Sequence, residues 1–263
     1  MSVVDLARFM DDLAGQSGSA ILPFFRGSFG LDDKAHGSGR AFDPVTEADR
    51  ASEAVMRRMI RETFPTHGIL GEEFGPENTQ AETVWVLDPI DGTRSFIVGL
   101  PTWGTLIGLT HRGAAVRGMM HQPFLDERFS GDGRTATLRS ARGERRLRTR
   151  RCERIADAIL ATTDPRLFEE DEERDRYRAV EAGVRMSRYG SDCYAYCMLA
   201  AGQIDLVIES GLKPYDIVAL IPIVEGAGGV ITAWDGGPAT EGGRIVAAGD
   251  PRLHAAAMAV LNP

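Results

Sequence analysis

The chain has 263 residues, of which 43% are hydrophobic and 26% charged, close to the average globular protein. Its 30 basic residues against 38 acidic ones give a net charge of −8, which argues against a nucleic-acid-binding protein. No stretch approaches the roughly 18 consecutive apolar residues of a membrane-spanning helix. Three cysteines without a CxxC pair argue against a disulfide framework. The first residues lack the basic and apolar segments of a signal peptide, so we expect a cytoplasmic protein.

The first half of the sequence predicts helices packed on an antiparallel sheet. Apolar spacing indicates one helix within residues 3–26, and a start resembling a capping box at Thr46 indicates a second. A polar stretch, Asp32–Arg40, separates them. From about residue 66 the periodicity becomes that of strands. These strands are expected at residues 69–70, 84–87, 103–109, 114–120, 127–130 and 135–138.

The second half predicts a mixed α/β layer. Residues 139–154 contain eight arginines and two glutamates, which favours a solvated hairpin and linker over an RNA-binding stretch, because no aromatic residues interleave the arginines. We therefore predict an N-terminal α+β part, 1–148, and a C-terminal α/β part, 149–263. Pro222 should kink the second of the helices expected in the C-terminal part. The helices are expected at 191–201, 217–227 and 251–261, and the strands at 204–208, 230–232 and 245–247.

The segment from Trp85 to Phe96 carries the strongest chemical signal. An apolar strand is expected to end at Asp88, followed by a turn at Pro89 and a second carboxylate at Asp91. Two carboxylates across a tight turn can converge on a hard cation that prefers oxygen ligands. The backbone N–H groups of the following Gly92 and Thr93, at a helix start, would face an anion such as phosphate.

Two further acidic segments can complete such a site. Glu72 and Glu73 are adjacent carboxylates between glycines, and their repulsion would be relieved by a shared metal ion. Asp216 precedes the helix expected at 217–227, where capping the helix is its simplest role. Singly, these features are explained by a solvated loop, a turn and a helix cap, whereas their combination indicates a metal site.

Four segments resemble, in order, the inositol monophosphatase superfamily of Mg²⁺-dependent, lithium-sensitive phosphomonoesterases. The resemblance spans about residues 40 to 250. It implies a two-part layered sugar-phosphatase fold, of α+β and α/β architecture, with the metal site in the cleft between the halves, and it also implies a homodimer. The four segments are Pro44–Asp49, Gly71-Glu72-Glu73, Asp88–Thr93, and Tyr215-Asp216 with Ala227-Gly228-Gly229.

The resemblance implies which residues bind each metal ion. Glu72, Asp88 and the carbonyl of Ile90 would hold one Mg²⁺. Asp88, Asp91 and Asp216 would hold a second, and a third would lie near Glu72, with Mn²⁺ as an alternative metal. Paired cations suit phosphate-ester hydrolysis because they stabilise the attacking and leaving oxygens. A phospho-aspartate at Asp88 or Asp91 is the chemical alternative, but it would leave Glu72 and Asp216 without roles.

The resemblance also implies how water and phosphate are held. Asp49 and Thr93 would orient the attacking water, with Glu72 as the third catalytic residue. Asp91, Gly92 and Thr93 would bind the phosphate group. No serine or cysteine nucleophile has a histidine partner in view, so a water nucleophile is expected.

Residues 94–105, 188–196 and 209–216 resemble the histidinol-phosphatase branch of this superfamily. That resemblance implies four substrate-binding residues: Arg188, Asp192, Glu209 and Asp216. Histidinol carries an ammonium group and an imidazole, so a carboxylate at Asp192 would form a charge-assisted pair with it. Capping of the helix at 191–201 is the alternative role of Asp192.

Two other functions remain open from the sequence. An inositol-1-monophosphatase of broad range would use the same metal site, although neutral inositol gains less from Asp192. Some members of the superfamily bind transcription or RNA complexes, and the arginines of 139–154 suit that role. Bisphosphorylated substrates are disfavoured, since Asp192 and Glu209 would repel a second phosphate.

Overall fold

The computed structural model describes residues 5–27, 31–33 and 44–263, with side-chain detail for 5–27 and 47–263. Most of the polar stretch expected at Asp32–Arg40 lies outside these ranges. Its first two residues fall in strand β1 (Leu31–Asp33), which pairs antiparallel with β2 (Pro44–Thr46). Among the helices within the described ranges, none combines the length and apolar character that a bilayer crossing requires.

An eight-stranded sheet forms the N-terminal half, in the order β10-β9-β8-β7-β6-β5-β3-β4. Strands β3 and β5 are parallel and the other neighbours are antiparallel, so the expectation of a wholly antiparallel sheet was wrong. A parallel pair needs a crossover, and the chain between β3 and β5 supplies it through the short edge strand β4. The strands are β3 (Gly68–Gly71), β4 (Gly75–Glu77), β5 (Thr83–Asp91), β6 (Gly104–His111), β7 (Ala114–Gln122), β8 (Glu127–Gly131), β9 (Ala136–Ser140) and β10 (Gly143–Arg146).

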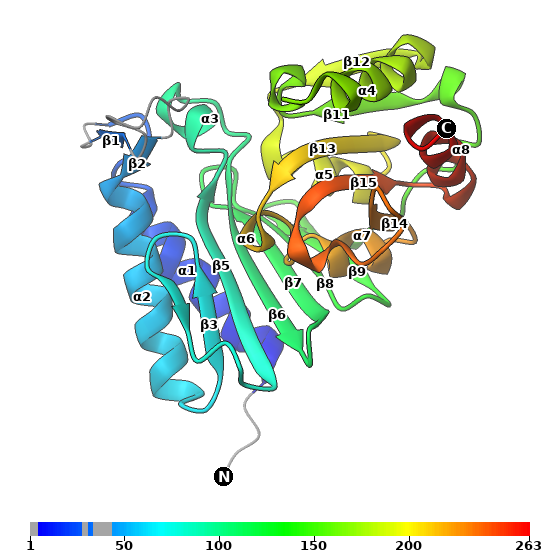
Figure 1. The fold of residues 1–263 in the computed structure, drawn as a ribbon. Coiled ribbons are helices and arrows are strands. Elements are labelled where there is room, and N and C mark those ends of the chain that lie inside the picture. The colour runs from blue at the N-terminus through cyan, green and yellow to red at the C-terminus, as the bar shows by residue number, and fades with distance from the viewer. Residues whose placement is uncertain (1–4, 28–30, 34–43) are drawn as a thin grey trace.

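Two long helices, α1 (Leu6–Ile21) and α2 (Glu47–Thr63), cover one face of this sheet (Figure 1). The Asp5 side chain caps α1 by accepting a hydrogen bond of 3.0 Å from the N–H of Ala7. Apolar residues at helical spacing on both helices are buried against the strands, as the periodicity predicted. This cluster includes Leu13, Met56 and Ile60 of the helices and Trp85, Leu87 and Ile107 of the sheet.

The C-terminal half is a five-stranded sheet in the order β12-β11-β13-β15-β14, with helices on its two faces (Figure 1). Helices α4 and α8 pack on the outer face in one apolar cluster, and α5, α6 and α7 lie between the two sheets. Its strands are β11 (Ile159–Thr162), β12 (Met186–Tyr189), β13 (Leu206–Leu212), β14 (Val230–Ala233) and β15 (Gly243–Ala248). Its helices are α4 (Asp171–Gly183), α5 (Asp192–Ala200), α6 (Pro214–Ile217), α7 (Ile221–Gly226) and α8 (Pro251–Leu261), besides single 3₁₀ turns at Ile155–Asp157, Pro165–Leu167 and Ala239–Glu241.

The helix expected at 217–227 is two short helices, α6 and α7, instead of one kinked helix. Pro222 is the reason, because proline fits the first turn of a helix, where its missing N–H costs nothing, but not the interior. The chain therefore starts a new helix at Ile221. Helix α6, which carries Asp216, contacts β5 of the N-terminal sheet.

Glycines of the N-terminal sheet let the C-terminal half approach closely. A Cβ at Gly118 of β7 would lie 1.8 Å from the carbonyl oxygen of Ala219, and one at Gly131 of β8 would lie 2.3 Å from that of Pro222. The backbone of the 218–223 segment thus rests directly on the sheet. One buried cluster contains residues of both halves, so the two sheets share a core, and the division into parts at residue 148 stays a prediction.

Candidate metal and phosphate site

Three carboxylates from the two halves converge where the sheets meet. Asp88 and Asp91 lie at the C-terminal end of strand β5, and Asp216 lies in helix α6. One ligand oxygen from each lies within 4.8 Å of the others. Asp88 is only 1% exposed, and its Oδ1 has no hydrogen-bond partner within the described part of the chain. A buried carboxylate oxygen without a donor suits a metal ligand.

The electrostatics of this cluster also fit a cation. Burial raises the pKa of Asp88 well above its usual value, and the negative charges of Glu72, Asp91, Asp216 and Asp49 raise it further, in that order. The structure therefore brings Asp88, Asp91 and Asp216 together, and Glu72 and Asp49 lie near enough for their charges to act on Asp88. Repulsion among hard oxygen donors is removed by a divalent cation such as Mg²⁺, so the donor set fits the metal that the resemblance implies.

The β5 strand continues through Pro89 to Asp91, whereas the sequence predicted an end at Asp88. The pairing with β6 shifts register between Asp88 and Asp91, and proline in a central strand is tolerated at such a bulge. The bulge places the two aspartates and the carbonyl of Ile90 at the same end of the strand. That carbonyl accepts a hydrogen bond of 3.1 Å from Thr93 Oγ1 and has a second lone pair for a ligand.

A backbone donor that the sequence could not reveal orients Asp91. The N–H of Cys193, at the start of α5, donates to Asp91 Oδ2 over 2.7 Å. Burial raises the pKa of Asp91 well above its usual value, as do the charges of Asp216 and Asp192, and the hydrogen bond from Cys193 opposes this. This contact links the two halves directly at the metal cluster.

Gly92 turns the chain from β5 into the short helix α3 (Thr93–Ile97). Its φ of 85° lies in the left-handed region, which glycine adopts without the strain that a side chain would cause. A Cβ at this position would also lie 2.9 Å from the Cβ, Cγ and Oδ2 atoms of Asp192. The predicted phosphate-binding turn and the predicted substrate carboxylate are therefore in direct contact.

Asp192 is the first residue of α5, and the position that caps this helix is occupied by Ser191, so a capping role for Asp192 was wrong. Asp192 has a φ of 44°, unusual for a residue with a side chain, and its Oδ2 accepts a hydrogen bond of 2.6 Å from Ser95. Thr102 donates in turn to Ser95 Oγ over 3.0 Å. Sequence reasoning missed Ser95 and Thr102, although both lie in the segment that resembles histidinol phosphatases.

The remaining predicted substrate residues are placed differently. Glu209 on β13 is 1% exposed and accepts hydrogen bonds from Thr163 N (2.7 Å), Thr163 Oγ1 (3.0 Å) and Thr162 Oγ1 (3.2 Å). Burial raises its pKa to about 8. Arg188 lies exposed on the edge strand β12. Asp216 Oδ2 accepts a hydrogen bond of 2.6 Å from Lys213 N, so Asp216 stabilises the start of α6 besides facing the other carboxylates.

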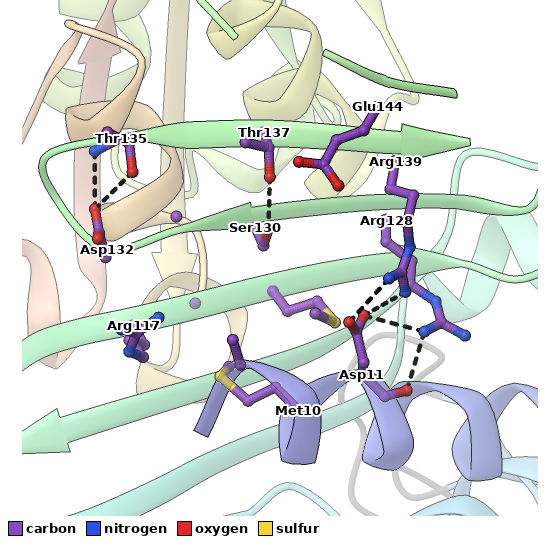
Figure 2. Close-up of a pocket in the computed structure, with 14 residues that line it drawn as sticks. Met10, Asp11, Arg117, Arg128, Ser130, Asp132, Thr135, Thr137, Arg139 and Glu144 are labelled. Atoms are coloured by element: carbon purple, nitrogen blue, oxygen red, sulfur yellow. Dashed lines mark hydrogen bonds and ion pairs between the residues drawn. The ribbon is translucent and has the colours of Figure 1, made fainter. Parts of the chain in front are cut away.

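A separate pocket of about 270 Å³ lies between α1 and the strands β7, β8 and β9. Figure 2 shows Arg128 and Arg139 pointing toward Asp11 of α1 within it. Arg128 donates to Asp11 Oδ1 over 3.1 Å and Arg139 to Asp11 Oδ2 over 3.0 Å. The acidic cluster does not line this pocket, and Arg139, the first arginine of the 139–154 stretch, has a structural role there.

Comparison with known proteins agrees with this geometry. The family model described as "Inositol monophosphatase family" matches residues 5–262. The Arabidopsis thaliana protein named "Bifunctional phosphatase IMPL2, chloroplastic" is 44% identical over 100% of this chain and 77% of its own length. The Mycobacterium tuberculosis protein named "Histidinol-phosphatase" is 34% identical over 83% of this chain and 85% of its own.

Other matches fall in the same family. The Vibrio cholerae protein named "Nus factor SuhB" is 32% identical over 78% of each chain. A solved structure of an inositol monophosphatase from Zymomonas mobilis is 39% identical, covers 97% of each chain, and superposes with a TM-score of 0.85. The match over nearly the whole length, together with the carboxylate cluster, shows that this chain belongs to the inositol monophosphatase family, whose members are metal-dependent phosphatases.

Proposed function

We propose that this protein is a Mg²⁺-dependent phosphomonoesterase that hydrolyses L-histidinol phosphate to L-histidinol and phosphate. The observation that carries the substrate assignment is the half-buried carboxylate of Asp192, which accepts a hydrogen bond from Ser95 and lies against the phosphate-binding turn at Gly92. The relative named histidinol-phosphatase supports the same assignment. A carboxylate at this position pairs with the ammonium or imidazolium group of histidinol, whereas inositol offers no positive charge.

Glu72, Asp88, the carbonyl of Ile90, Asp91 and Asp216 would hold the cations. When bound, two such ions stabilise the attacking and leaving oxygens of a phosphoryl transfer and lower the pKa of a bound water. The chain contributes the orientation of these ligands, since the Cys193 N–H donates to Asp91 and the Lys213 N–H to Asp216.

Other residues act on the water and the ester. Asp49, which is 2% exposed on α2, and Thr93 orient the attacking water in this proposal. The N–H groups of Gly92 and Thr93 bind the phosphate oxygens, where the transition state spreads its charge. The leaving alcohol then points toward Asp192. Substrate contacts of Glu209 and Arg188 stay predictions, because the first is buried among threonine donors and the second lies on an exposed edge strand.

The experiment is release of inorganic phosphate from L-histidinol phosphate and from inositol-1-phosphate, with Mg²⁺ and with EDTA. Asp91→Asn tests the metal site and Asp192→Asn tests the substrate assignment. Asp157→Asn, at an exposed residue outside the cluster, is the matched control. We expect Mg²⁺-dependent hydrolysis of histidinol phosphate that Asp91→Asn abolishes and Asp157→Asn leaves unchanged.

The two substrates separate the outcomes. Asp192→Asn should reduce kcat/KM for histidinol phosphate by about tenfold or more, the effect of about 1.5–3 kcal/mol from one charged hydrogen bond, and change inositol phosphate hydrolysis less. Preference of the wild type for inositol phosphate would refute the histidinol assignment and keep the metal site. No hydrolysis of either ester would refute the proposal as a whole.

Two other functions have specific support. The similarity to the Zymomonas mobilis inositol monophosphatase favours a broad inositol phosphatase as the second candidate. The relatives named Nus factor SuhB keep a nucleic-acid partner open. Against that partner, Arg139 pairs with Asp11 and Arg150 with the buried Asp205, so these two arginines stabilise the fold. A salt-sensitive RNA complex lost on Arg145→Ala and Arg146→Ala would favour it.

Oligomeric state and compartment belong to the same proposal. We propose a homodimer. Its molar mass can be measured by size-exclusion chromatography with light scattering. A cytoplasmic location stays a prediction, and the Arabidopsis relative carries the word chloroplastic in its name. Localisation of a tagged chain distinguishes the two compartments.

A further inference from the structure

A buried ion pair on α2 lies directly behind the loop that carries Glu72. The carboxylate of Glu53 and the guanidinium of Arg57 are one helical turn apart, with side chains 0% and 4% exposed. Arg57 Nε donates to Glu53 Oε1 over 2.7 Å. A buried pair of this kind gives little net stability, because desolvation of two charges offsets their attraction. Its contacts with the loop are therefore the informative part.

Glu53 binds the backbone on the C-terminal side of Glu72. Its Oε2 accepts a hydrogen bond of 2.7 Å from the N–H of Glu73, and its Oε1 accepts one of 3.2 Å from the N–H of Phe74. On the other side, the N–H of Glu72 donates to the carbonyl of Leu87 on β5 over 3.2 Å. The backbone on each side of the Glu72 side chain is thus fixed, once by β5 and once by Glu53.

Gly71 leaves the space that Glu53 fills. A Cβ at Gly71 would lie 2.0 Å from Glu53 Oε1 and 2.4 Å from its Cδ. The φ of Gly71 does not itself require glycine. Glycine is needed at this position because any side chain would displace the carboxylate of Glu53. Arg57 completes the arrangement by donating to the carbonyl of Gly75 and, over 3.2 Å, to Glu77 Oε2.

We propose that Glu53, held by Arg57, is the positioning residue that aims Glu72 at the metal cluster. This inference rests on the proposed function, which assigns Glu72 to a cation. Glu53 touches neither substrate nor cation and acts through the backbone of residues 73 and 74. Residues that orient a metal ligand in this way change metal affinity by about 10–100-fold when they are replaced.

The test is Glu53→Gln, which keeps the size of the side chain but removes the charge and one acceptor oxygen. Binding of Mn²⁺ to the metal-free protein is measured by calorimetry, so the readout does not depend on activity. We expect affinity to fall about 10–100-fold. At saturating Mg²⁺ the activity should largely return, since the substrate and water residues are untouched. Glu82→Gln removes a glutamate from an exposed pair with Arg112 and is the matched control.

Two further variants keep the outcomes distinct. Gly71→Ala displaces Glu53 without altering its charge and should weaken Mn²⁺ binding in the same range; it carries the test if Glu53→Gln does not fold. Glu72→Gln should remove one cation. Unchanged affinity in Glu53→Gln and Gly71→Ala, with a loss in Glu72→Gln, would overturn this inference alone. Unchanged affinity in Glu72→Gln would overturn the metal role of Glu72, and the inference with it.

Discussion

Replacement of Gly118 by alanine tests whether contact between the two halves builds the metal site. Gly118 lies on β7, and its absent side chain makes room for the backbone of Ala219. That backbone follows α6, which carries Asp216. A Cβ at position 118 would lie 1.8 Å from the carbonyl oxygen of Ala219 and 2.6 Å from its carbonyl carbon. Both are backbone atoms, so no side-chain rotation removes the clash.

The size of the effect follows from this geometry. Ordinary van der Waals contact begins at 3.4 Å, so the segment after α6 must move away from the sheet to accept the methyl group. Overpacking of this kind typically costs about 1–3 kcal/mol. For a chain of this length each kcal/mol lowers Tm by about 2–4 °C, which predicts a decrease of about 2–12 °C. Asp216 should move with the segment, so Mg²⁺ affinity should also fall.

The assay is thermal unfolding followed by circular dichroism, with EDTA and across a Mg²⁺ titration. Gly15→Ala is the matched control, because a Cβ there would lie 3.5 Å from the end of the flexible Arg128 side chain. Gly15 lies inside α1, where alanine should stabilise the helix by up to about 1 kcal/mol. The reasoning is refuted if Gly118→Ala unfolds at the wild-type temperature and binds Mg²⁺ with wild-type affinity.

Three other substitutions have definite expected results. Burial raises the pKa of Glu209 to about 8, so the folded state keeps a proton that the unfolded state loses above about pH 4.5. As the pH rises from about 4.5 to 8, the wild type should therefore lose stability relative to Glu209→Gln, which denaturant titrations at several pH values would measure. Asp205→Ala leaves the N–H of Ile159 without its acceptor at 2.8 Å and should lower the free energy of unfolding by about 1–3 kcal/mol, measured by urea titration. Asp216→Asn removes a charge that repels Asp91 and should raise Tm in EDTA while reducing the gain in Tm on adding Mg²⁺.

The sequence predicted those elements whose signals are local. Helix α8 runs from Pro251 to Leu261 as expected, because the Asp250 side chain caps it by accepting from Arg252 N and Pro251 sits in its first turn. Helix α4 was not predicted, because it begins in the strongly acidic segment 164–175. The apolar residues that it buries are Tyr177 and Val180. A helix with so narrow an apolar stripe has a weak periodic signal.

The residues of the candidate site also fall into those that local sequence motifs predicted and those that only the folded structure shows. The acidic motifs were visible because each is a short run of residues, and the structure brings Asp88, Asp91 and Asp216 together. The groups that orient them were not visible. The N–H of Cys193 has no side-chain signature and lies 102 residues from Asp91. Glu53 and Arg57 read as the polar face of an amphipathic helix, and only the packing of α2 against the loop at 71–75 shows that they are buried.

The placement of the acidic cluster explains why the site needs two halves. Asp88 and Asp91 belong to β5 of one sheet, whereas Asp216 and Cys193 come from helices that lie between the sheets. Burial raises the pKa of Asp91, and the charges of Asp216 and Asp192 raise it further, so this repulsion acts across the contact between the halves. A cation that binds all three carboxylates would turn this repulsion into attraction. Metal binding should thus stabilise the contact that creates the site, and folding and catalysis would depend on the same few residues.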